Sequence, residues 1–474
     1  MRTRRPTSRT GYRFAHQMTR RQLLSALVAG AAGLTGVAGH GAKVWAAAAP
    51  QAPAAPVKSY AGTQLRVSVF DQAYPQALKK RLPEFEAKTG MKVDLEILSF
   101  PVYNQRAEME LSGGGGANDV MTLVFIQSSK WINAGFATDL NPIIEDAKLT
   151  DGASLALEDF SPGALGIFRR GRAIFGLPYF AGGTLMMYRK DILEKNGFAA
   201  PPDTIDQFVD VAKKIHSKEV AAYMSWGQSA LDWVYANYLF ALGGGFLAKP
   251  PEDVTPTLNT PQAEKALAVY VDLMRNYAPP GVINFAEGEL GTVFPQGKAA
   301  LWIEDVGRFA PTLDPQRSRV VDKVAFAHVP QGPAGRFPQV GTHAMMIPVG
   351  CKRKEAAWEF IKWATGKELM GRIAAEEFHP GVTRISAAEA TTHAKQYIYG
   401  ATNVGKLHGE VLKMAGTGYM AYRVIPEYPQ LRDIINVALA QAITGQKSLK
   451  DALAGAQAQA VALLESKGYK IRKG

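Results

Sequence analysis

Short strand-like runs alternate with stretches of helical spacing through the first part of this chain. Residues 65–70 alternate apolar and polar side chains with a period of two, and residues 75–88 then follow a helical pattern. Residues 92–98 give a second strand, and residues 119–125 give a third that is nearly continuous in apolar side chains. Because strands separated by helices pair in parallel, this pattern predicts an α/β fold.

The rest of the chain is richer in helical patterns and has no obvious boundary. Helical spacing is found at residues 203–216, 230–242, 261–277, 353–371 and 430–467, and short strand patterns at residues 184–188, 299–303, 324–329 and 343–347. A length of 474 residues predicts more than one domain, yet no Gly/Ser-rich linker separates two halves. We therefore expect two lobes joined by several crossings of the chain, with a ligand cleft outside the carboxyl ends of their strands.

The net charge of +12 comes mostly from the first 49 residues, which contain eight Lys and Arg residues and no acidic residue. The remainder has 46 basic and 42 acidic residues, a net charge of only +4. Nucleic acid is therefore not an expected partner, because its binding needs a basic surface on the folded part of the chain.

The basic segment belongs to a predicted export signal over residues 1–49. A basic stretch ends at Arg21, a weakly apolar run follows, and small residues suited to signal peptidase close the segment. The run is shorter than the roughly 20 apolar residues of a permanent membrane span, so an uncleaved anchor is only the alternative. Residues 19–24 (TRRQLL) resemble the twin-arginine export motif, and Met18 is an alternative start.

The mature protein is therefore expected to be free in the periplasm, or secreted. No cysteine follows the apolar run, which excludes a lipid-anchored form. Residues 50–62 are rich in Pro and Ala and are expected to be a linker, so the fold should begin near Gln64. The single Cys351 excludes an internal disulfide and any site built from paired thiolates.

Several segments carry a resemblance to a known family. They are residues 85–93 (FEAKTGMKV), 118–120 (NDV), 134–140 (AGFATDL), 176–179 (GLPY), 185–191 (LMMYRKD), 294–301 (FPQGKAAL), 356–363 (AAWEFIKW) and the tail from Gly445 to Leu453. In this order they resemble the motifs of the family 1 extracellular solute-binding proteins, the carbohydrate-capturing subunits of ABC importers. Asn118, Arg189 and Ile205 depart from the family's Pro, Asn and Trp.

The resemblance implies a two-lobe periplasmic-binding-protein (type II) fold that closes over its ligand by hinge bending. Lobe 1 would comprise residues 63–180 and 330–378, and lobe 2 would comprise residues 181–329 and 379–474. The function implied is capture of a sugar or polyol and its delivery to permease subunits, by a monomer with no cofactor, metal or catalytic residue.

A sugar has polar edges and apolar faces, so its site should combine aromatic rings with charged or amide groups. Three candidates follow the first three predicted strands. Asp71 is either a ligand group or the cap of the next helix, Tyr103 is either a ligand platform or a core residue, and Gln127 is a further ligand candidate.

The second half of the chain supplies the other candidates. Tyr179 lies in the family's lobe-crossing segment, and Trp226 and Trp233 flank a predicted helix start, where each stacks on ligand or fills the core. The adjacent Glu304 and Asp305 end a predicted strand and are costly to bury without a polyhydroxyl ligand or a cation.

The resemblance adds Arg308, with Phe309 as the alternative, as a substitute for an aromatic residue of the relatives. It also places residues 341–343 and 383–385, including Arg384, where the family tends to contact ligand, although a polar surface loop is the alternative for both segments. Residues 181–183 (AGG) replace a carboxylate that α-glucan-specific relatives carry, which disfavours maltose-like specificity.

Two alternative functions remain at this point. A binding protein of the same fold could hold a polyamine through Asp71, Glu304 and Asp305, or a glycerol phosphate through Arg308 and Arg384. A periplasmic glycan-cleaving enzyme is disfavoured because neighbouring carboxyls on a strand point in opposite directions. The sequence also has no nucleophile elbow, no phosphate loop followed by Gly-Lys-Ser/Thr, and no His-Glu-x-x-His.

Overall fold

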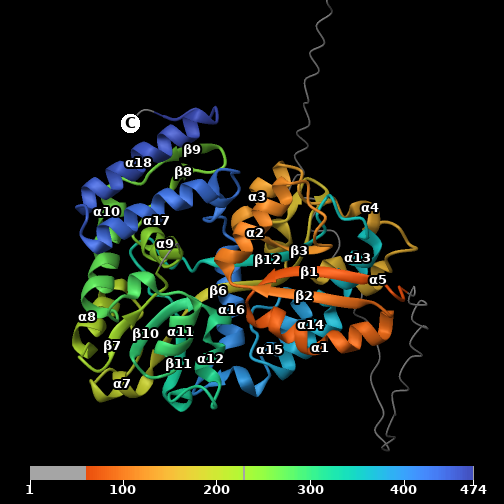
Figure 1. Cartoon of the computed structure of the whole chain (residues 1–474). Coiled ribbons are helices and arrows are strands. Elements are labelled where there is room, and N and C mark those ends of the chain that lie inside the picture. The colour runs from red at the N-terminus through yellow and green to blue at the C-terminus, as the bar shows by residue number, and fades with distance from the viewer. Residues whose placement is uncertain (1–59, 228–229, 473–474) are drawn as a thin grey trace, which may run out of the picture. The chain divides into compact units, whose positions relative to one another are not determined.

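The computed structural model describes residues 60–227 and 230–472, and the labelled elements of Figure 1 lie in these ranges. The predicted export signal, residues 1–49, and most of the predicted linker, residues 50–62, lie outside the described residues. Within the described part, no helix combines the length and the apolar character needed to cross a membrane.

The first three strands pair in parallel, which confirms the interpretation of the alternating pattern. Strand β1 (Gln64–Phe70) pairs with both β2 (Lys92–Leu98) and β3 (Val120–Val124). Helix α1 (Ala73–Thr89) connects β1 to β2, and α2 (Phe100–Ser112) connects β2 to β3. The carboxyl ends of the three strands therefore lie at the same edge of the sheet.

Each face of this sheet is covered by helices. The alternate apolar residues of β1 from Leu65 to Val69 are buried in one cluster with α1 and α13 (Lys354–Ala364). Helix α3 (Phe125–Asn133) and helix α2 belong to a second cluster on the opposite face. Because α3 follows β3 directly, its first turn begins at the edge where the parallel strands end.

One long strand, β6 (Leu177–Arg189), joins the two parts of the eight-stranded sheet, and Figure 1 shows it between β12 and β10. Its first half pairs antiparallel with β12 (Val340–Met346), which in turn pairs with β3. Its second half pairs antiparallel with β10 (Ala299–Asp305) and β11 (Val324–His328). The sequence indicated only the second half, because the first contains Pro178 and consecutive glycines.

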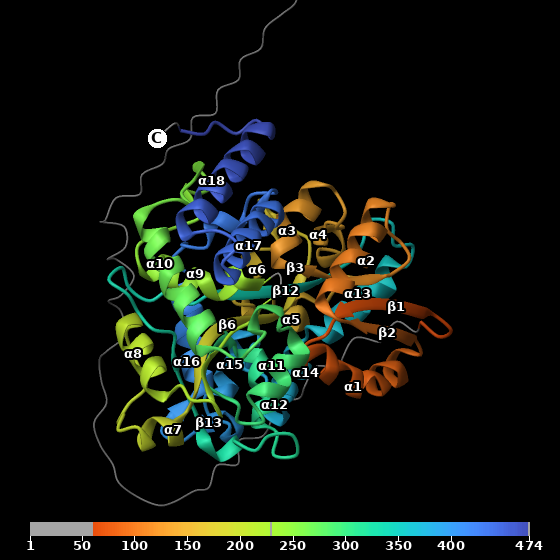
Figure 2. The same cartoon turned by 60° about the vertical axis from the view of Figure 1, so that its left-hand side comes forward.

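Beyond β6, strand β7 (Ala221–Met224) pairs in parallel with β10 at the far end of the sheet. Helix α8 (Ile205–Ile215) packs against β7, and its first turn is closed by a capping box. Helices α9 (Leu231–Ala241), α10 (Pro261–Asp272) and α17 (Tyr428–Thr444) pack on one another, and Figures 1 and 2 show them together from both directions.

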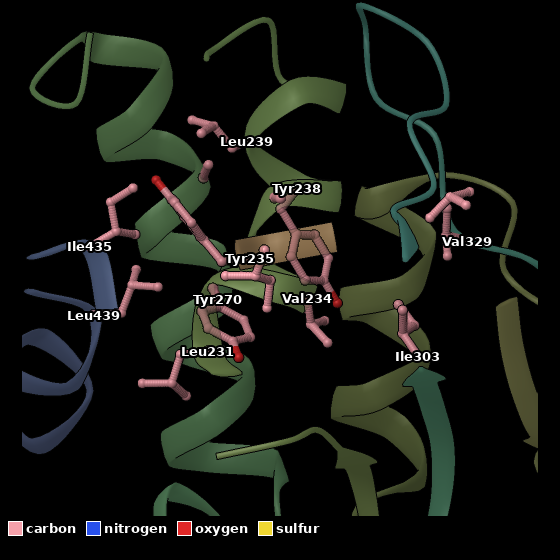
Figure 3. Close-up of a cluster of buried hydrophobic side chains, with 14 of the residues drawn as sticks. Leu231, Val234, Tyr235, Tyr238, Leu239, Tyr270, Ile303, Val329, Ile435 and Leu439 are labelled. Carbon is pink, nitrogen blue, oxygen red and sulfur yellow. The ribbon is translucent and has the colours of Figure 1, made fainter. Parts of the chain in front are cut away.

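The contact among these three helices is a dense group of apolar and aromatic side chains. Tyr235 and Tyr238 of α9 lie close to Tyr270 of α10, with ring centroids 5.9 Å apart in each pair, and Leu439 of α17 belongs to the same cluster (Figure 3). This packing fixes the position of α9, whose first turn carries Trp233.

The prediction of one helix over residues 353–371 is wrong. Helix α13 ends at Ala364 and α14 (Lys367–Glu376) begins after Gly366, whose backbone is extended (φ −67°, ψ 147°). The strong helix formers on both sides of Thr365 and Gly366 concealed this break in the sequence.

The Ala-rich stretch predicted to be helical over residues 430–467 is divided into two helices, because α17 ends and α18 (Leu449–Ser466) begins within that range. Gly445 closes α17 in the left-handed conformation (φ 79°), which favours glycine. Ser448 then caps α18 by accepting a hydrogen bond from Asp451 N.

The remaining α-helices and strands are α4 (Asn141–Ile144), α5 (Gly152–Leu155), α6 (Pro162–Gly166), β4 (Arg169–Arg170), β5 (Ala173–Ile174), α7 (Lys190–Lys195), β8 (Leu247–Lys249), β9 (Asp253–Pro256), α11 (Glu287–Val293), α12 (Ala310–Leu313), α15 (Ile385–Thr391), β13 (Ile398–Tyr399), β14 (Thr402–Asn403) and α16 (Val404–Ala415).

Candidate functional site

A cavity open to solvent lies where the carboxyl ends of the parallel strands meet, and it encloses about 560 Å³ including its mouth. One side is formed by residues that end or follow β1, β2 and β3 and by β12: Phe70, Gln72, Phe100, Phe125, Ile126, Gly341 and His343. The other side is formed by residues that follow β7, end β10, or lie on α9 and α17: Trp226, Ala230, Asp232, Trp233, Glu304, Asp305, Arg308, Tyr428 and Arg432.

Aromatic rings from both sides form much of the cavity wall. The rings of Phe125 and Trp233 lie 6.0 Å apart, and Gly341 fits between them. A Cβ atom at Gly341 would lie only 3.0 Å from the Phe125 ring and 3.3 Å from the Trp233 ring. On the side of the cavity that carries both residues, the Arg308 guanidinium carbon lies 4.1 Å from the centre of the Trp226 ring.

Two adjacent carboxyl groups, those of Glu304 and Asp305, border the same cavity although they are sequence neighbours. The strand ends at Asp305, whose carboxylate accepts a hydrogen bond from Gly307 N (2.8 Å) at the start of the following turn. Glu304 Oε1 accepts a hydrogen bond from Asp305 N (2.7 Å). A Cβ at Gly182 would overlap the Asp305 carboxylate, so glycine is needed there.

Burial changes the protonation of these groups. It raises the pKa of Glu304 to about 8 and that of Asp305 to about 7, although nearby Arg308 and backbone N–H groups oppose both shifts. Burial also lowers the pKa of His343 to about 3, and the positive charge of Arg308 adds to that shift. The ligand-free cavity at neutral pH therefore has a neutral imidazole and largely protonated Glu304.

Four polar atoms of the lining are buried without a hydrogen bond of ordinary geometry: Glu304 Oε2, Trp233 Nε1, His343 Nδ1 and Gln72 Oε1. The Trp233 side chain nevertheless lies close enough to the Glu304 carboxyl to lower its pKa slightly, against the larger effect of burial. An unpaired buried donor or acceptor is costly, so native structures normally satisfy such groups or reserve them for a ligand. The cavity lining thus combines hydrogen-bond donors and acceptors with aromatic rings.

A second charged pair of the lining is fully satisfied. Arg432 Nε donates to Asp232 Oδ2 (2.9 Å), and Asn436 Nδ2 donates to Asp232 Oδ1 (3.0 Å). Asp232 N in turn donates to Asn436 Oδ1 (2.9 Å). This pair joins α9 to α17 and holds the helix that carries Trp233.

The Glu304→Gln substitution should stabilise the ligand-free protein increasingly as pH rises. With a folded-state pKa of about 8 against an ordinary 4.5, Glu304 binds more protons in the folded than in the unfolded chain between these values. The free energy of unfolding therefore falls with rising pH in that window, by up to about 1.4 kcal/mol per pH unit, and the variant lacks this loss. Urea denaturation at pH 4.5, 6 and 8 measures the difference, and a difference independent of pH would contradict the expectation.

Half of the residues predicted from the sequence line the cavity. Those that do are Trp226, Trp233, Glu304, Asp305 and Arg308. Those that do not are Asp71, Tyr103, Gln127, Tyr179 and Arg384. The first group lies at or just after the ends of β7 and β10 or in the first turn of α9.

Two of the outlying residues are buried tyrosines that make internal hydrogen bonds. Tyr103 OH donates to the carbonyl of Thr122 (2.5 Å), and Tyr179 OH lies 3.2 Å from Thr122 Oγ1. Both side chains have no exposed surface, and Tyr179 also stacks on Tyr74. They support the sheet behind the cavity.

Two further residues that do not line the cavity are Asp71 and Gln127, whose surroundings differ from those of the tyrosines. Asp71 is exposed, accepts a hydrogen bond from Gln76 Nε2 (2.7 Å), and does not cap α1, whose N-cap position is Gln72. Gln127 follows the lining residue Ile126, and its buried Oε1 has no hydrogen-bond partner.

Arg384 is 1% exposed and donates to the carbonyls of Thr365, Leu155 and Ala156. Its guanidinium also lies 3.6 Å from the Phe160 ring. Through these contacts Arg384 holds chain segments together, and its side chain does not line the cavity.

Sequence reasoning missed Asp232, Tyr428 and Arg432. The sequence could have indicated Asp232, because a carboxylate in the apolar first turn of a helix is buried there and needs a partner. The partner could not be identified, since Arg432 lies 200 residues away in sequence. Within the described chain, no group of three or more His, Cys, Asp or Glu side chains could hold a metal ion.

Residues 68–370 match the family model described as bacterial extracellular solute-binding protein. A mannitol-binding protein of Pseudomonas aeruginosa is 25% identical over 421 residues, covering 84% of this chain and 92% of that protein. An erythritol/L-threitol-binding protein of Mycolicibacterium smegmatis is 22% identical over 350 residues, covering 70% of this chain and 72% of that protein.

Solved structures give the same fold, of two-lobe solute-binding proteins. The ABC transporter solute-binding protein of Agrobacterium radiobacter K84 in complex with ribitol matches with a TM-score of 0.73 and 25% identity, covering 86% of this chain and 100% of that one. The counterpart of Agrobacterium vitis S4 with bound D-mannitol matches with a TM-score of 0.73 and 24% identity, covering 86% of this chain and 99% of that one, and supports the fold alone.

Proposed function

Because the chain belongs to the bacterial extracellular solute-binding protein family, we propose that it is the substrate-binding subunit of an ABC importer for a sugar or polyol. Residues 63–180 and 330–378 would form one lobe, and residues 181–329 and 379–474 the other, joined at β6. The lobes would close over the ligand and carry it to the membrane permease. The relatives that bind ribitol and mannitol make small polyols the first ligands to test.

The observation that carries this proposal is the set of unpaired buried polar atoms among aromatic rings. A hydroxyl group both donates and accepts hydrogen bonds, so a polyol can pair Glu304 Oε2, Trp233 Nε1 and His343 Nδ1 at once. The C–H faces of the same ligand would lie against Trp226 and Phe125. We assign the ligand contacts to Trp226, Trp233, Glu304, Asp305 and Arg308, which were predicted from the sequence, and to His343.

The charge balance of the cavity favours a neutral ligand. A polyamine would need ionised carboxylates, whereas burial raises the pKa of both Glu304 and Asp305. A phosphate would need free guanidinium groups, whereas Arg432 is paired with Asp232 and Arg308 lies 3.4 Å from a carboxylate oxygen of Glu287. Polyamines and glycerol phosphates are therefore expected to bind weakly.

We further propose that the ligand leaves chemically unchanged, as expected of a carrier. The predicted twin-arginine signal would export the protein to the periplasm, where a monomer would dock on two permease subunits. Recovery of mature protein from a periplasmic extract, and its loss from that extract after Arg20 and Arg21 are both replaced by lysine, would test the export route.

A thermal-shift panel on residues 50–474 tests the ligand class. Ribitol, D-mannitol, erythritol, maltose, putrescine and glycerol 3-phosphate are compared at equal concentration. A ligand at 100 times its dissociation constant adds about 2.7 kcal/mol to the free energy of unfolding, so a true ligand raises the melting temperature clearly. We expect a polyol to give the largest shift, and a larger shift from putrescine or glycerol 3-phosphate would overturn the assignment.

A further inference from the structure

The chain between α16 and α17 passes close to the cavity without lining it. Its short 3-10 turn, Ala421–Arg423, ends in an arginine whose side chain is 9% exposed. Next to it, the carbonyl of Val424 accepts a hydrogen bond from Ser129 Oγ of α3 (2.7 Å). This segment therefore contacts the part of the chain that contains β1 to β3 as well as the part that contains α17.

The Arg423 guanidinium is held by neutral acceptors. Nη1 donates to the carbonyl of Val340 (2.6 Å), and Nη2 donates to Gln339 Oε1 (2.6 Å). Nε donates to Tyr422 OH (3.0 Å), which itself donates to Gln339 Oε1 (2.9 Å). Among the residues that the structure describes, no carboxylate forms an ion pair with Arg423.

Aromatic rings supply the rest of its surroundings. The guanidinium carbon lies 4.8 Å from the centre of the Phe125 ring and 5.5 Å from the Trp233 ring. These rings belong to opposite sides of the cavity, one on α3 and the other on α9. The strand residue that accepts from Nη1, Val340, directly precedes Gly341, which fits between the two rings.

We propose that Arg423 is a positioning residue that holds Phe125 and Trp233 together across the two sides of the cavity in the arrangement that accepts ligand. A buried cation without a counter-ion is costly, and Arg423 is stabilised only while both rings and the acceptors of Gln339 and Val340 are near. Separation of α3 from α9 removes part of that stabilisation. Arg423 thus favours the state in which Phe125 of α3 and Trp233 of α9 lie close together. This inference rests on the proposed binding function.

The Arg423→Lys variant tests the inference, because lysine keeps the charge but lacks the planar guanidinium that spans both acceptors and lies beside the rings. The first measurement is its affinity for D-mannitol by isothermal titration calorimetry. The second needs no ligand: spin labels at Met109→Cys on α2 and Val437→Cys on α17 report the distance between the two sides. These positions are 68% and 52% exposed, whereas the native Cys351 is 4% exposed and stays unlabelled.

We expect Arg423→Lys to weaken D-mannitol binding by about tenfold or more and to broaden the distance distribution. The control is Arg81→Lys, because Arg81 is also buried, at 8% exposed, but is paired with Glu376 and Glu377 and does not line the cavity. The control should lose stability but keep the wild-type affinity and distances. Equal broadening in both variants, or wild-type affinity or distances in Arg423→Lys, would overturn the inference.

Two further provisions keep the test informative. If Arg423→Lys does not fold, the milder Tyr422→Phe variant, which loses the hydroxyl between Arg423 and Gln339, decides by the same two measurements. If the wild-type protein binds neither D-mannitol nor ribitol, the proposed ligand class fails. The distance distribution alone then decides whether Arg423 positions the two walls.

Discussion

Replacing Glu304 with alanine is expected to weaken the binding of D-mannitol by about 100-fold, which corresponds to about 3 kcal/mol. The Glu304 side chain has no exposed surface, and its Oε2 atom lacks a hydrogen-bond partner in the ligand-free chain. Because burial raises the pKa of Glu304 to about 8, the carboxyl is largely protonated at neutral pH and pairs with a ligand hydroxyl through a neutral hydrogen bond. Truncating the side chain leaves that ligand hydroxyl without its partner, which costs about 1–3 kcal/mol.

The same substitution should also cost about 1–3 kcal/mol of stability, because Asp305 N loses the buried carboxyl oxygen to which it donates. Asp119→Asn is the matched control, because Asp119 is also buried, at 1% exposed, but bonds to Arg353 (2.9 Å) and lies outside the cavity lining. We expect the control to lose stability and keep its affinity, measured by chemical denaturation and calorimetry. Wild-type affinity in Glu304→Ala would show that the carboxyl does not contact the ligand.

Replacing Asp232 with alanine is expected to lower the free energy of unfolding by about 3–5 kcal/mol. The side chains of Asp232 and Arg432 are 6% and 10% exposed, so the variant leaves a buried guanidinium without its partner. Asn436 Nδ2 also loses the carboxylate oxygen to which it donates. The hydrogen bond from the backbone N–H of position 232 to Asn436 Oδ1 loses its geometry. Because this pair joins α9 to α17, D-mannitol binding should weaken too.

Glu84→Ala provides the comparison for Asp232→Ala. Glu84 forms an ion pair with Arg372 (2.6 Å), but these side chains are 53% and 39% exposed. Solvent screens such a pair, so its loss should cost no more than about 1 kcal/mol. Equal losses of stability in the two variants, measured by urea denaturation, would contradict the structural role given to the buried pair.

The sequence indicated the first three strands and their parallel pairing because that information is local. Period-two alternation in residues 65–70 and the helical spacing after it are sufficient to predict β1 and α1. The breaks at Gly366 and Gly445 were missed for different reasons. Gly445, followed by Ser448 and Asp451, carries a recognisable stop and start signal, whereas Gly366 is surrounded by strong helix formers.

The candidate site was only partly predictable, since burial depends on distant parts of the chain. Glu304 and Asp305 were found because carboxyl groups at a strand end rarely fit a core, and Arg308 was found through the family resemblance. Tyr103 and Tyr179 looked equally suitable, but each fills space behind the sheet through a hydrogen bond or contact with Thr122. No local pattern distinguishes a tyrosine that faces a cavity from one that faces a helix.

Arg423 could be predicted from the sequence even less than the residues that line the cavity. Its acceptors, Val340 and Gln339, lie more than 80 residues before it in sequence, and the rings beside it come from α3 and α9. Neither the sequence motifs nor the cavity lining indicates it. Its role arises only because three segments that are distant in sequence come into contact in the fold.

A crystal structure of the mature protein with the polyol that gives the largest thermal shift is the decisive measurement. We predict an intact ligand in the cavity, with one hydroxyl hydrogen-bonded to Glu304 Oε2, another accepting from Trp233 Nε1, and carbon atoms against Trp226. An empty cavity with the polyol bound elsewhere, or a cleaved or oxidised product in its place, would contradict the proposed carrier function.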